Sequence, residues 1–374
     1  MAENLMDYLR WRGDLPFSET APWNEVDALV LAMLCYNPLS DPEAATEQGV
    51  SLRELAPRLD LMERTGSVYF RQWREVLYTC AGTRRFGDMV IHDYVDLVDD
   101  ALAMQFSVLT ADLPDGTSCV AYRGTDDTIT GWHEDFDMGY ESPVPSQREA
   151  AAYLTRIAGR SDRGLHVCGH SKGGNLAAYG AAFAEEAAQA RLLDVFSFDG
   201  PGLDDEALES EGYLRIRPRL RSVIPQSSVV GLLLGYHTDY QVVHAQQVGI
   251  FQHDGLSWQL DGPRFRLDET VDDASAALCE GLHSWLKSIG MEERRAFVDA
   301  LYSILEGARV QTTGELADAR AMLAMGNVYR RMEKEQKRLV QELLRRAAGE
   351  TVEAGWKRFV ARLEEKNDAL LHRL

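Results

Sequence analysis

The sequence contains one short motif whose residue types and spacing suit nucleophilic catalysis. Gly169-His170-Ser171-Lys172-Gly173 fits Gly-x-Ser-x-Gly, a pattern that holds a serine on a tight turn between a strand and a helix. Glycine has no Cβ, so the two outer glycines permit the close backbone contacts that such a turn requires. We therefore expect Ser171 to project freely as a nucleophile. The amide of Lys172 is expected to point toward the same space at a helix N-terminus, where unpaired N–H groups favour developing negative charge.

Acyl transfer by a serine needs two further side chains: a histidine that takes the hydroxyl proton, and a carboxylate that orients the histidine. In folds that carry this motif, the three residues follow one another along the chain as Ser, Asp or Glu, and His. Ser171, Asp199 and His253 obey this order. Asp199 ends an apolar segment, and His253 follows a short apolar segment in a polar loop. We predict that these three residues form a catalytic triad.

Other residues could supply the acid and the base. Asp239 is the alternative carboxylate, and Asp199 could simply form the turn before Gly-Pro-Gly, since aspartate favours turns. His244 and His237 are alternative bases, because both also lie beyond the serine motif. His170 precedes the serine, where the chain order is wrong for a base.

The segments that must position these residues alternate between strands and helices. A hairpin is predicted at Gln105 to Ala111 and Thr117 to Tyr122, because turn residues separate two apolar runs. The pattern then predicts a helix at Ala150 to Ala158, a strand at Leu165 to Gly169, a helix from Lys172 to about Gln189, and a strand at Leu193 to Phe198. This alternation implies right-handed parallel crossovers. We therefore expect an α/β fold with a mostly parallel sheet and helices on both faces.

Three regions of the chain differ in their apolar pattern. Residues 1–85 are expected as an N-terminal helical extension that packs on the core, 86–266 as the α/β core, and 267–374 as a C-terminal helical region. The apolar stretch Val229 to Leu234 is expected as a buried helix or, alternatively, as a lid over an acyl pocket. Ile250 to Gly255 is expected as a short strand that runs into a polar loop.

Composition and charge restrict the classes of function. The formal net charge of -20 argues against binding nucleic acid or anionic lipid by bulk electrostatics. The five cysteines are scattered and include no C-x-x-C pair, so neither a disulfide framework nor a zinc site is indicated. The sequence shows no secretion signal and no apolar run long enough to span a bilayer. We therefore expect a cytoplasmic protein that needs no metal or cofactor.

Several motifs, taken in order, resemble those of a known family. They are Tyr-Arg-Gly-Thr-Asp-Asp-Thr at 122–128 with Gly-Trp-His-Glu-Asp-Phe at 131–136, Gly-His-Ser-Lys-Gly-Gly-Asn at 169–175, Phe-Asp-Gly-Pro-Gly at 198–202, and Gln-His-Asp-Gly-Leu-Ser-Trp at 252–258. With these motifs the chain resembles the class 3 lipases, and more closely a bacterial family of lipase-like α/β-hydrolases. The resemblance covers roughly residues 100 to 260. It implies an α/β-hydrolase core, to which the apolar pattern adds the helical regions at the N- and C-terminal ends.

The resemblance also implies roles for individual residues. In the lipases, the residue after Arg-Gly in the first motif supplies an oxyanion-hole amide, which points to Thr125, with Asp126 next along the chain. The serine of the Gly-x-Ser-x-Gly motif is the nucleophile in these enzymes, and Ser171 holds this position here. Fungal lipases carry the acid in an Arg-Asp-hydrophobic-hydrophobic-Pro segment, but the similar segment of this chain has Ser222 at the aspartate position. Other lipases carry the acid one strand earlier, at the place of Asp199.

Two charged side chains beside these motifs have structural explanations. Arg123 is expected to form an ion pair, and Asp135 is a candidate partner. A cation in the first turn of a helix opposes the helix dipole, so Lys172 is unusual at its position. Its side chain is expected to be solvated, and a contact with an anionic substrate group is the alternative.

The sequence therefore predicts a serine esterase or lipase that cleaves a carboxylic ester of a small molecule or lipid through an acyl-enzyme on Ser171. A thioesterase or peptidase could use the same triad. The competing class is a catalytically idle α/β-hydrolase scaffold whose helical ends bind a partner protein, because a fold alone does not specify chemistry.

Overall fold

The computed structural model describes residues 3–59, 68–126, 134–135, 137–138, 141–232, 240–288, 290–308, 319–338 and 341. The chain divides into two units. The first comprises residues 1–126 and 142–276, and the second comprises residues 127–141 and 277–374. Ser171, Asp199 and His253 all lie in the first unit.

A nine-stranded mixed sheet forms the centre of the first unit. Its strands lie in the order β1 (Val50–Ser51), β2 (Val90–Asp99), β3 (Met104–Asp112), β4 (Ser118–Tyr122), β5 (Leu165–His170), β6 (Leu192–Phe198), β7 (Leu220–Pro225), β8 (Tyr240–Val243) and β11 (Leu267–Asp268). The central strands β4 to β8 run parallel, as the alternation of strands and helices predicts. The outer pairs are antiparallel, and they include the predicted hairpin of β3 and β4. A separate small sheet pairs β9 (Leu260–Asp261) with β10 (Arg264–Phe265).

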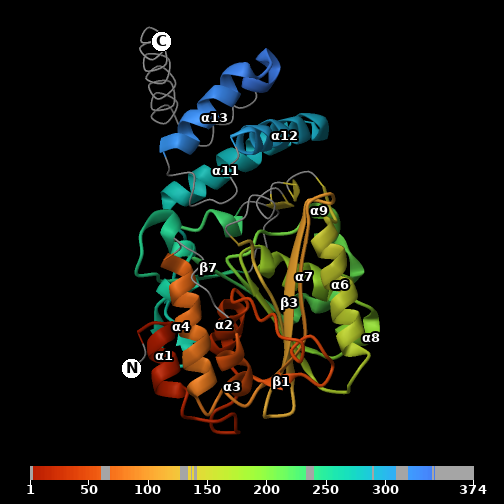
Figure 1. Cartoon of the computed structure of the whole chain (residues 1–374), viewed down its shortest axis with the longest axis vertical. Helices are drawn as coiled ribbons and strands as arrows, with labels where there is room; N and C mark the ends of the chain where they lie inside the picture. The colour runs from red at the N-terminus through yellow and green to blue at the C-terminus, as the bar shows by residue number, and fades with distance from the viewer. Residues whose placement is uncertain are drawn as a thin grey trace. The chain divides into compact units, whose positions relative to one another are not determined.

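Helices cover both faces of this sheet (Figure 1). On one side lie α1 (Leu5–Arg12), α2 (Glu25–Leu34) and α4 (Val68–Gly82), and on the other lie α6 (Pro145–Ala158), α7 (Lys172–Phe183) and α8 (Glu186–Gln189). Shorter segments complete the unit: α3 (Leu52–Leu55), η1 (Ala56–Arg58), α9 (Asp205–Glu209), α10 (Glu211–Ile216), η2 (Arg217–Arg219) and η3 (Val230–Leu232). The residues of α7 are mostly glycine and alanine, and small side chains allow a helix to lie close to the strands.

The helix α2 is buried against the sheet because nearly all its residues are apolar. Every residue from Val26 to Leu34 is buried, and these side chains share one core with those of the central strands. Asn24 and Asp27 form a capping box that satisfies the first amides of the helix. The N-terminal helices thus complete the core of the sheet.

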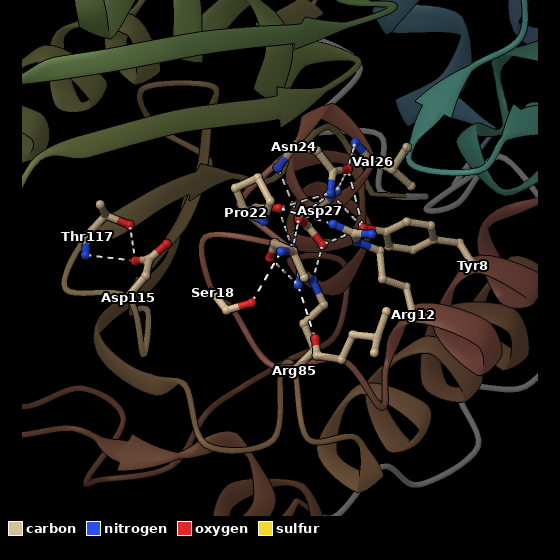
Figure 2. A network of polar contacts seen from close by, with 12 residues as sticks. Tyr8, Arg12, Ser18, Pro22, Asn24, Val26, Asp27, Arg85, Asp115 and Thr117 are labelled. Carbon is tan, nitrogen blue, oxygen red and sulfur yellow. Dashed lines mark hydrogen bonds and ion pairs between the residues drawn. The ribbon is translucent and has the colours of Figure 1, made fainter.

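A buried ion pair anchors the N-terminal helices. The guanidinium of Arg85 donates hydrogen bonds of 2.5 and 2.7 Å to the carboxylate of Asp27, and both side chains have no exposed surface. Figure 2 shows that Tyr8 points into the same cluster, where its hydroxyl donates to Asp27 at 2.8 Å. Arg85 also donates to the carbonyls of Leu15, Ala21 and Pro22. A buried pair with its remaining donors satisfied in this way avoids the cost of an uncompensated charge.

The segment before His253 differs from its prediction. A short strand was expected at Ile250 to Gly255, but the chain forms two short 3₁₀ helices, η4 (Gly249–His253) and η5 (Gly255–Ser257). Gly249 has a φ of 60°, which turns the chain out of an extended path. The carboxylate of Asp254 accepts a hydrogen bond from the amide of Leu256 and caps η5. The local turn chemistry therefore outweighs the short apolar run.

The bounds of two further segments differ from their predictions. The predicted helix from Lys172 to about Gln189 is two helices, because Ala184 adopts an extended conformation at the end of α7. Of the apolar stretch Val229 to Leu234, the residues Val230–Leu232 form a 3₁₀ turn, and the last two residues lie outside the described part of the chain.

The second unit is helical in its described part. It contains most of α11 (Asp273–Ser288), together with α12 (Met291–Gly307) and α13 (Ala319–Arg331). The last two helices pack through Ala300, Ile304 and Tyr329. Within the described ranges of the whole chain, every helix falls short of the length and apolar character that a bilayer crossing requires.

Candidate active site

Ser171 stands on a strained turn between β5 and α7. Its φ of 59° and ψ of -133° lie in a region that residues with a Cβ rarely adopt, at a cost on the order of 1–3 kcal/mol. Its amide donates a 2.9 Å hydrogen bond to the carbonyl of Phe198, at the end of β6. A Cβ on Gly169 would lie 2.0 Å from the carbonyl oxygen of Gly173, and a Cβ on Gly173 would lie 2.2 Å from that of Tyr122. Both glycines of the motif are therefore required by backbone contacts.

The parallel pairing of β5 and β6 brings Ser171 and Asp199 to the same edge of the sheet. His170 and Phe198 are partners in the register, so the residue after each of them leaves its strand at neighbouring positions. Asp199 also has a positive φ, of 45°, and its side chain is 1% exposed. The sequence places the serine motif and the aspartate at the carboxyl ends of adjacent parallel strands, where open α/β sheets carry their ligand sites.

Asp199 holds the imidazole of His253. Nδ1 of His253 donates a 2.6 Å hydrogen bond to Oδ2 of the carboxylate. The other oxygen, Oδ1, accepts from the hydroxyl of Ser228 at 2.5 Å and from the amide of Gly231 at 3.2 Å. Because a carboxylate only accepts, the proton of the neutral imidazole lies on Nδ1 and the lone pair on Nε2. This is the tautomer that a general base needs.

The backbone of His253 is held by the residue next to Ser171. Nε2 of His170 donates a 2.7 Å hydrogen bond to the carbonyl oxygen of His253, and the two rings lie 4.6 Å apart between centroids. The hydroxyl of Tyr36, which follows α2, then donates to Nδ1 of His170 at 2.8 Å. Burial, and next the charge of His253, lower the pKa of His170 well below its usual value. His170 is therefore neutral, with its proton on Nε2.

The segment around His253 is anchored at both ends. The indole of Trp258 is fully buried and donates a 2.8 Å hydrogen bond to the carbonyl of Gln252. The side-chain oxygen of Gln252 accepts from the amide of Ser227 at 2.7 Å. A Cβ on Gly255 would lie 3.1 Å from a methyl carbon of Leu29, so the segment rests on α2. These contacts fix the path of the chain on both sides of the histidine.

The loop after β4 lies against the serine turn. A Cβ on Gly124 would lie 3.0 Å from Cβ of Ser171, and a Cβ on Gly173 would lie 2.9 Å from the amide nitrogen of Gly124. Thr125 follows directly, and Lys172 is the first residue of α7. The two residues predicted to supply oxyanion amides thus stand on the two segments that meet at Ser171.

The predicted ion pair of Arg123 is present, whereas the side chain of Lys172 differs from its prediction. Arg123 pairs with Asp96 of β2 at 2.9 Å and lies 4.0 Å from a carboxylate oxygen of Asp126. A contact of Arg123 with Asp135 stays a prediction. The side chain of Lys172 is buried rather than solvated, with 1% of its surface exposed. Its Nζ donates a 2.9 Å hydrogen bond to the carbonyl of Gln105.

The alternative acid and base lie elsewhere or outside the described residues. His244 follows β8, and its Nε2 lies 3.3 Å from a carboxylate oxygen of Asp268 in β11. Asp239 and His237 fall within residues 233–239, which are outside the described part of the chain. Ser222 lies in β7, and its buried hydroxyl has no hydrogen-bond partner among the described residues. Among the described histidines, His253 is the one that contacts Asp199.

Sequence reasoning did not find Tyr36, Gln105 and Ser228. Tyr36 is 134 residues from His170, and Gln105 is 67 residues from Lys172. Neither residue belongs to a local motif, so only the pairing of strands and helices brings them to the site. Ser228 lies 29 residues beyond Asp199, in a turn whose sequence gives no signal of this contact.

Comparison with solved structures finds lipases at low similarity. The native Rhizomucor miehei lipase propeptide complex is 14% identical, with a TM-score of 0.31, over 50% of this chain and 64% of that one. M37 lipase is 12% identical, with a TM-score of 0.35, over 55% and 67%. A triacylglycerol lipase from Penicillium expansum is 14% identical, with a TM-score of 0.30, over 48% and 76%. The chain thus spans less than two thirds of the Rhizomucor protein.

A search of curated proteins found no match. A family model described as Mbeg1-like, however, matches residues 80–303, which is more than half of the chain. The matched range includes Ser171, Asp199 and His253 with the strands that carry them, and Tyr36 lies before it. The chain belongs to the Mbeg1-like family.

Proposed function

We propose that this protein is a serine hydrolase of the esterase or lipase kind, built on an α/β-hydrolase core. One observation carries the proposal. The carboxylate of Asp199 binds Nδ1 of His253 at 2.6 Å, and its strand ends beside the strained turn that presents Ser171. A nucleophile, a base and an orienting acid in this chain order form the constellation that performs acyl transfer.

In the acylation step, Oγ of Ser171 attacks the carbonyl carbon of the ester while Nε2 of His253 takes the hydroxyl proton. Asp199 stabilises the imidazolium that forms. The carbonyl oxygen becomes an oxyanion, which accepts hydrogen bonds from the backbone amides of Thr125 and Lys172. The tetrahedral intermediate then expels the alcohol, which receives the proton from Nε2. The acyl group remains on Ser171.

In the second half of the cycle, a water molecule attacks the acyl carbon and gives one proton to Nε2 of His253. As the second tetrahedral intermediate collapses, the bond between the acyl carbon and Oγ of Ser171 breaks, Nε2 of His253 gives the proton to Oγ, and the carboxylic acid is released. The cycle uses protein side chains, backbone amides and water, and calls for no metal or cofactor.

The surroundings of His253 favour a substrate with an apolar portion. The imidazole is 30% exposed, and two residues of the same segment, Val248 and Phe251, are 80% and 58% exposed. Apolar surface beside a polar catalytic group suits an ester with an acyl or alkyl chain. We therefore propose a small-molecule or lipid ester as the substrate class.

Turnover of matched substrates tests this function. The panel comprises p-nitrophenyl esters of increasing acyl length, a thioester and an anilide of the same acyl group. We expect ester hydrolysis that falls at least about a thousandfold in Ser171→Ala. A dominant thioester or anilide activity, also lost in Ser171→Ala, would assign the other leaving group. Absence of turnover in every arm would favour the idle scaffold that binds a protein partner.

We also propose a reducing location such as the cytoplasm. The five cysteines are buried, and none of them forms a disulfide bond in the structure. The sulfur atoms of Cys119 and Cys168 lie 3.6 Å apart without a bond, and such neighbouring thiols are typical of reducing compartments.

A further inference from the structure

Gln105 joins the two segments that carry the proposed oxyanion amides. It lies in β3, and its side chain is 1% exposed. Its side-chain oxygen accepts a 3.2 Å hydrogen bond from the amide of Asp126, and its backbone carbonyl accepts the 2.9 Å bond from Nζ of Lys172. One residue therefore contacts both the loop after β4 and the first residue of α7.

The loop after β4, the strand β3 and the helix α7 each contact the other two. The loop is also tied to β3 by a 2.9 Å hydrogen bond from the amide of Arg123 to the carbonyl of Ser107. It lies on α7 where the position of a Cβ on Gly173 is 2.9 Å from the amide nitrogen of Gly124. The hydrogen bond to Asp126 holds the peptide unit that follows Thr125. A side chain from another strand therefore restricts the path of the loop directly after the Thr125 amide.

The ammonium of Lys172 is buried and has polar partners, of which the carbonyl of Gln105 in β3 is one. The cation also stands in the first turn of a helix, where it opposes the dipole. Positive charge close to a developing oxyanion is favourable in a water-poor site.

We propose that Gln105, Asp126 and Lys172 form an oxyanion brace. Gln105 is a positioning residue, which holds the Thr125 amide at a fixed place relative to the Lys172 amide. The ammonium of Lys172 anchors the first turn of α7 to β3 and keeps a positive charge on the residue that supplies the second oxyanion amide. This inference rests on the proposed function, because it assigns a role in the same reaction.

The test compares substrate turnover with binding of an oxyanion-forming inhibitor. Oγ of Ser171 adds to the carbonyl carbon of a trifluoromethyl ketone, and the adduct carries an oxyanion at the position that the Thr125 and Lys172 amides face. The Ki of the ketone therefore reports stabilisation of the oxyanion, whereas KM reports interactions with the substrate in its ground state. Gln105→Met keeps the volume of the side chain and removes the acceptor for Asp126. We expect kcat to fall about tenfold and the Ki of the ketone to rise in parallel, with KM changed less than about twofold.

A matched control separates positioning from stability. Gln189, the last residue of α8, is also 1% exposed, and it donates to the carbonyls of Ala181 and Ala182 in α7. Gln189→Met should lower the melting temperature but leave kcat and Ki unchanged. If Gln105→Met behaves in the same way, the brace is overturned.

Lys172→Met provides a second variant, because it retains the backbone amide and removes only the ammonium. We expect it to lower kcat and weaken the ketone with little change in KM, and an unchanged Ki would overturn the role of the charge. Wild-type protein that neither hydrolyses esters nor binds the ketone would instead overturn the proposed function. The two failures are therefore distinguishable.

Discussion

Nδ1 of His253 lies 2.6 Å from Oδ2 of Asp199, although 54 residues separate them in the chain. This contact determines which nitrogen of His253 can accept a proton. The strand before Asp199 is the neighbour of the strand before Ser171, so both residues lie at the same edge of the sheet.

Asp199→Asn tests the role of this carboxylate. The amide keeps the volume of the side chain but can donate, which favours the wrong tautomer of His253 and leaves the imidazolium without a counter-charge. We expect kcat/KM for an ester to fall by three to four orders of magnitude, on the order of the loss in known triads. The matched control is Asp268→Asn, which removes the carboxylate beside His244. A larger loss in the control would transfer the acid–base role to that pair.

Ser228→Ala tests the support of the acid. It removes the 2.5 Å hydrogen bond to Oδ1 of Asp199 and leaves the 3.2 Å bond from the amide of Gly231. The carboxylate then gains freedom to turn away from His253, so kcat/KM should fall about tenfold. Ser222→Ala is the control, because its buried hydroxyl has no described partner. Equal kinetics of the two variants would contradict this role of Ser228.

His170→Leu and His170→Gln test the support of the base. A glutamine retains an N–H that can donate to the carbonyl of His253, as Nε2 of His170 does at 2.7 Å, and leucine removes it. We expect kcat/KM to fall about tenfold in His170→Leu and to recover most of this loss in His170→Gln. The measurement is the pH profile of kcat/KM, together with thermal unfolding. A loss that follows only the melting temperature in both variants would mean that His170 serves stability alone.

Two histidines are expected to change the pH dependence of the unfolding free energy in opposite directions. Burial keeps the pKa of His170 below its usual 6.5, so below this pH the unfolded chain binds a proton that the folded chain does not, and stability falls as the pH falls. For His92, burial opposes the charge, but hydrogen bonds to Asp112 and Asp93 outweigh burial and raise its pKa above 6.5. The contribution of protonated His92 to stability is complete below pH 6.5, and it is lost as the pH rises through the raised pKa.

Urea unfolding between about pH 5 and 9 measures both effects. His170→Gln should reduce the loss of unfolding free energy on the acid side, and His92→Gln should reduce the loss on the alkaline side. Unchanged slopes in the two variants would show that other groups govern the pH dependence.

The sequence was informative where a local pattern determines the structure. The strand, turn and helix around Ser171 were predictable because backbone contacts admit only glycine at two positions of the turn. The hairpin of β3 and β4 followed from two apolar runs and the turn residues between them. The order of Asp199 and His253 was readable too, and the parallel pairing of β5 and β6 adds that Asp199 lies beside the serine turn. The alternative acid, Asp239, lies outside the described residues.

Contacts between distant segments could not be predicted from the sequence. The burial of Lys172 depends on β3, which reaches the first turn of α7 only in the folded sheet. The contact of Tyr36 with His170 requires α2 to pack on the central strands. At Ile250 to Gly255 the apolar residues suggested a strand, but a positive φ at Gly249 and the cap at Asp254 produced 3₁₀ turns.

The most direct measurement is the site of covalent modification by a fluorophosphonate. Intact-mass and peptide analysis should find one adduct per chain, on Ser171, in the wild-type protein. The labelling rate should fall by about a thousandfold or more in His253→Ala, and labelling should be absent in Ser171→Ala. Equal labelling of the wild type and Ser171→Ala, or no adduct on folded wild-type protein, would contradict the assignment of Ser171 as the nucleophile activated by His253 and Asp199.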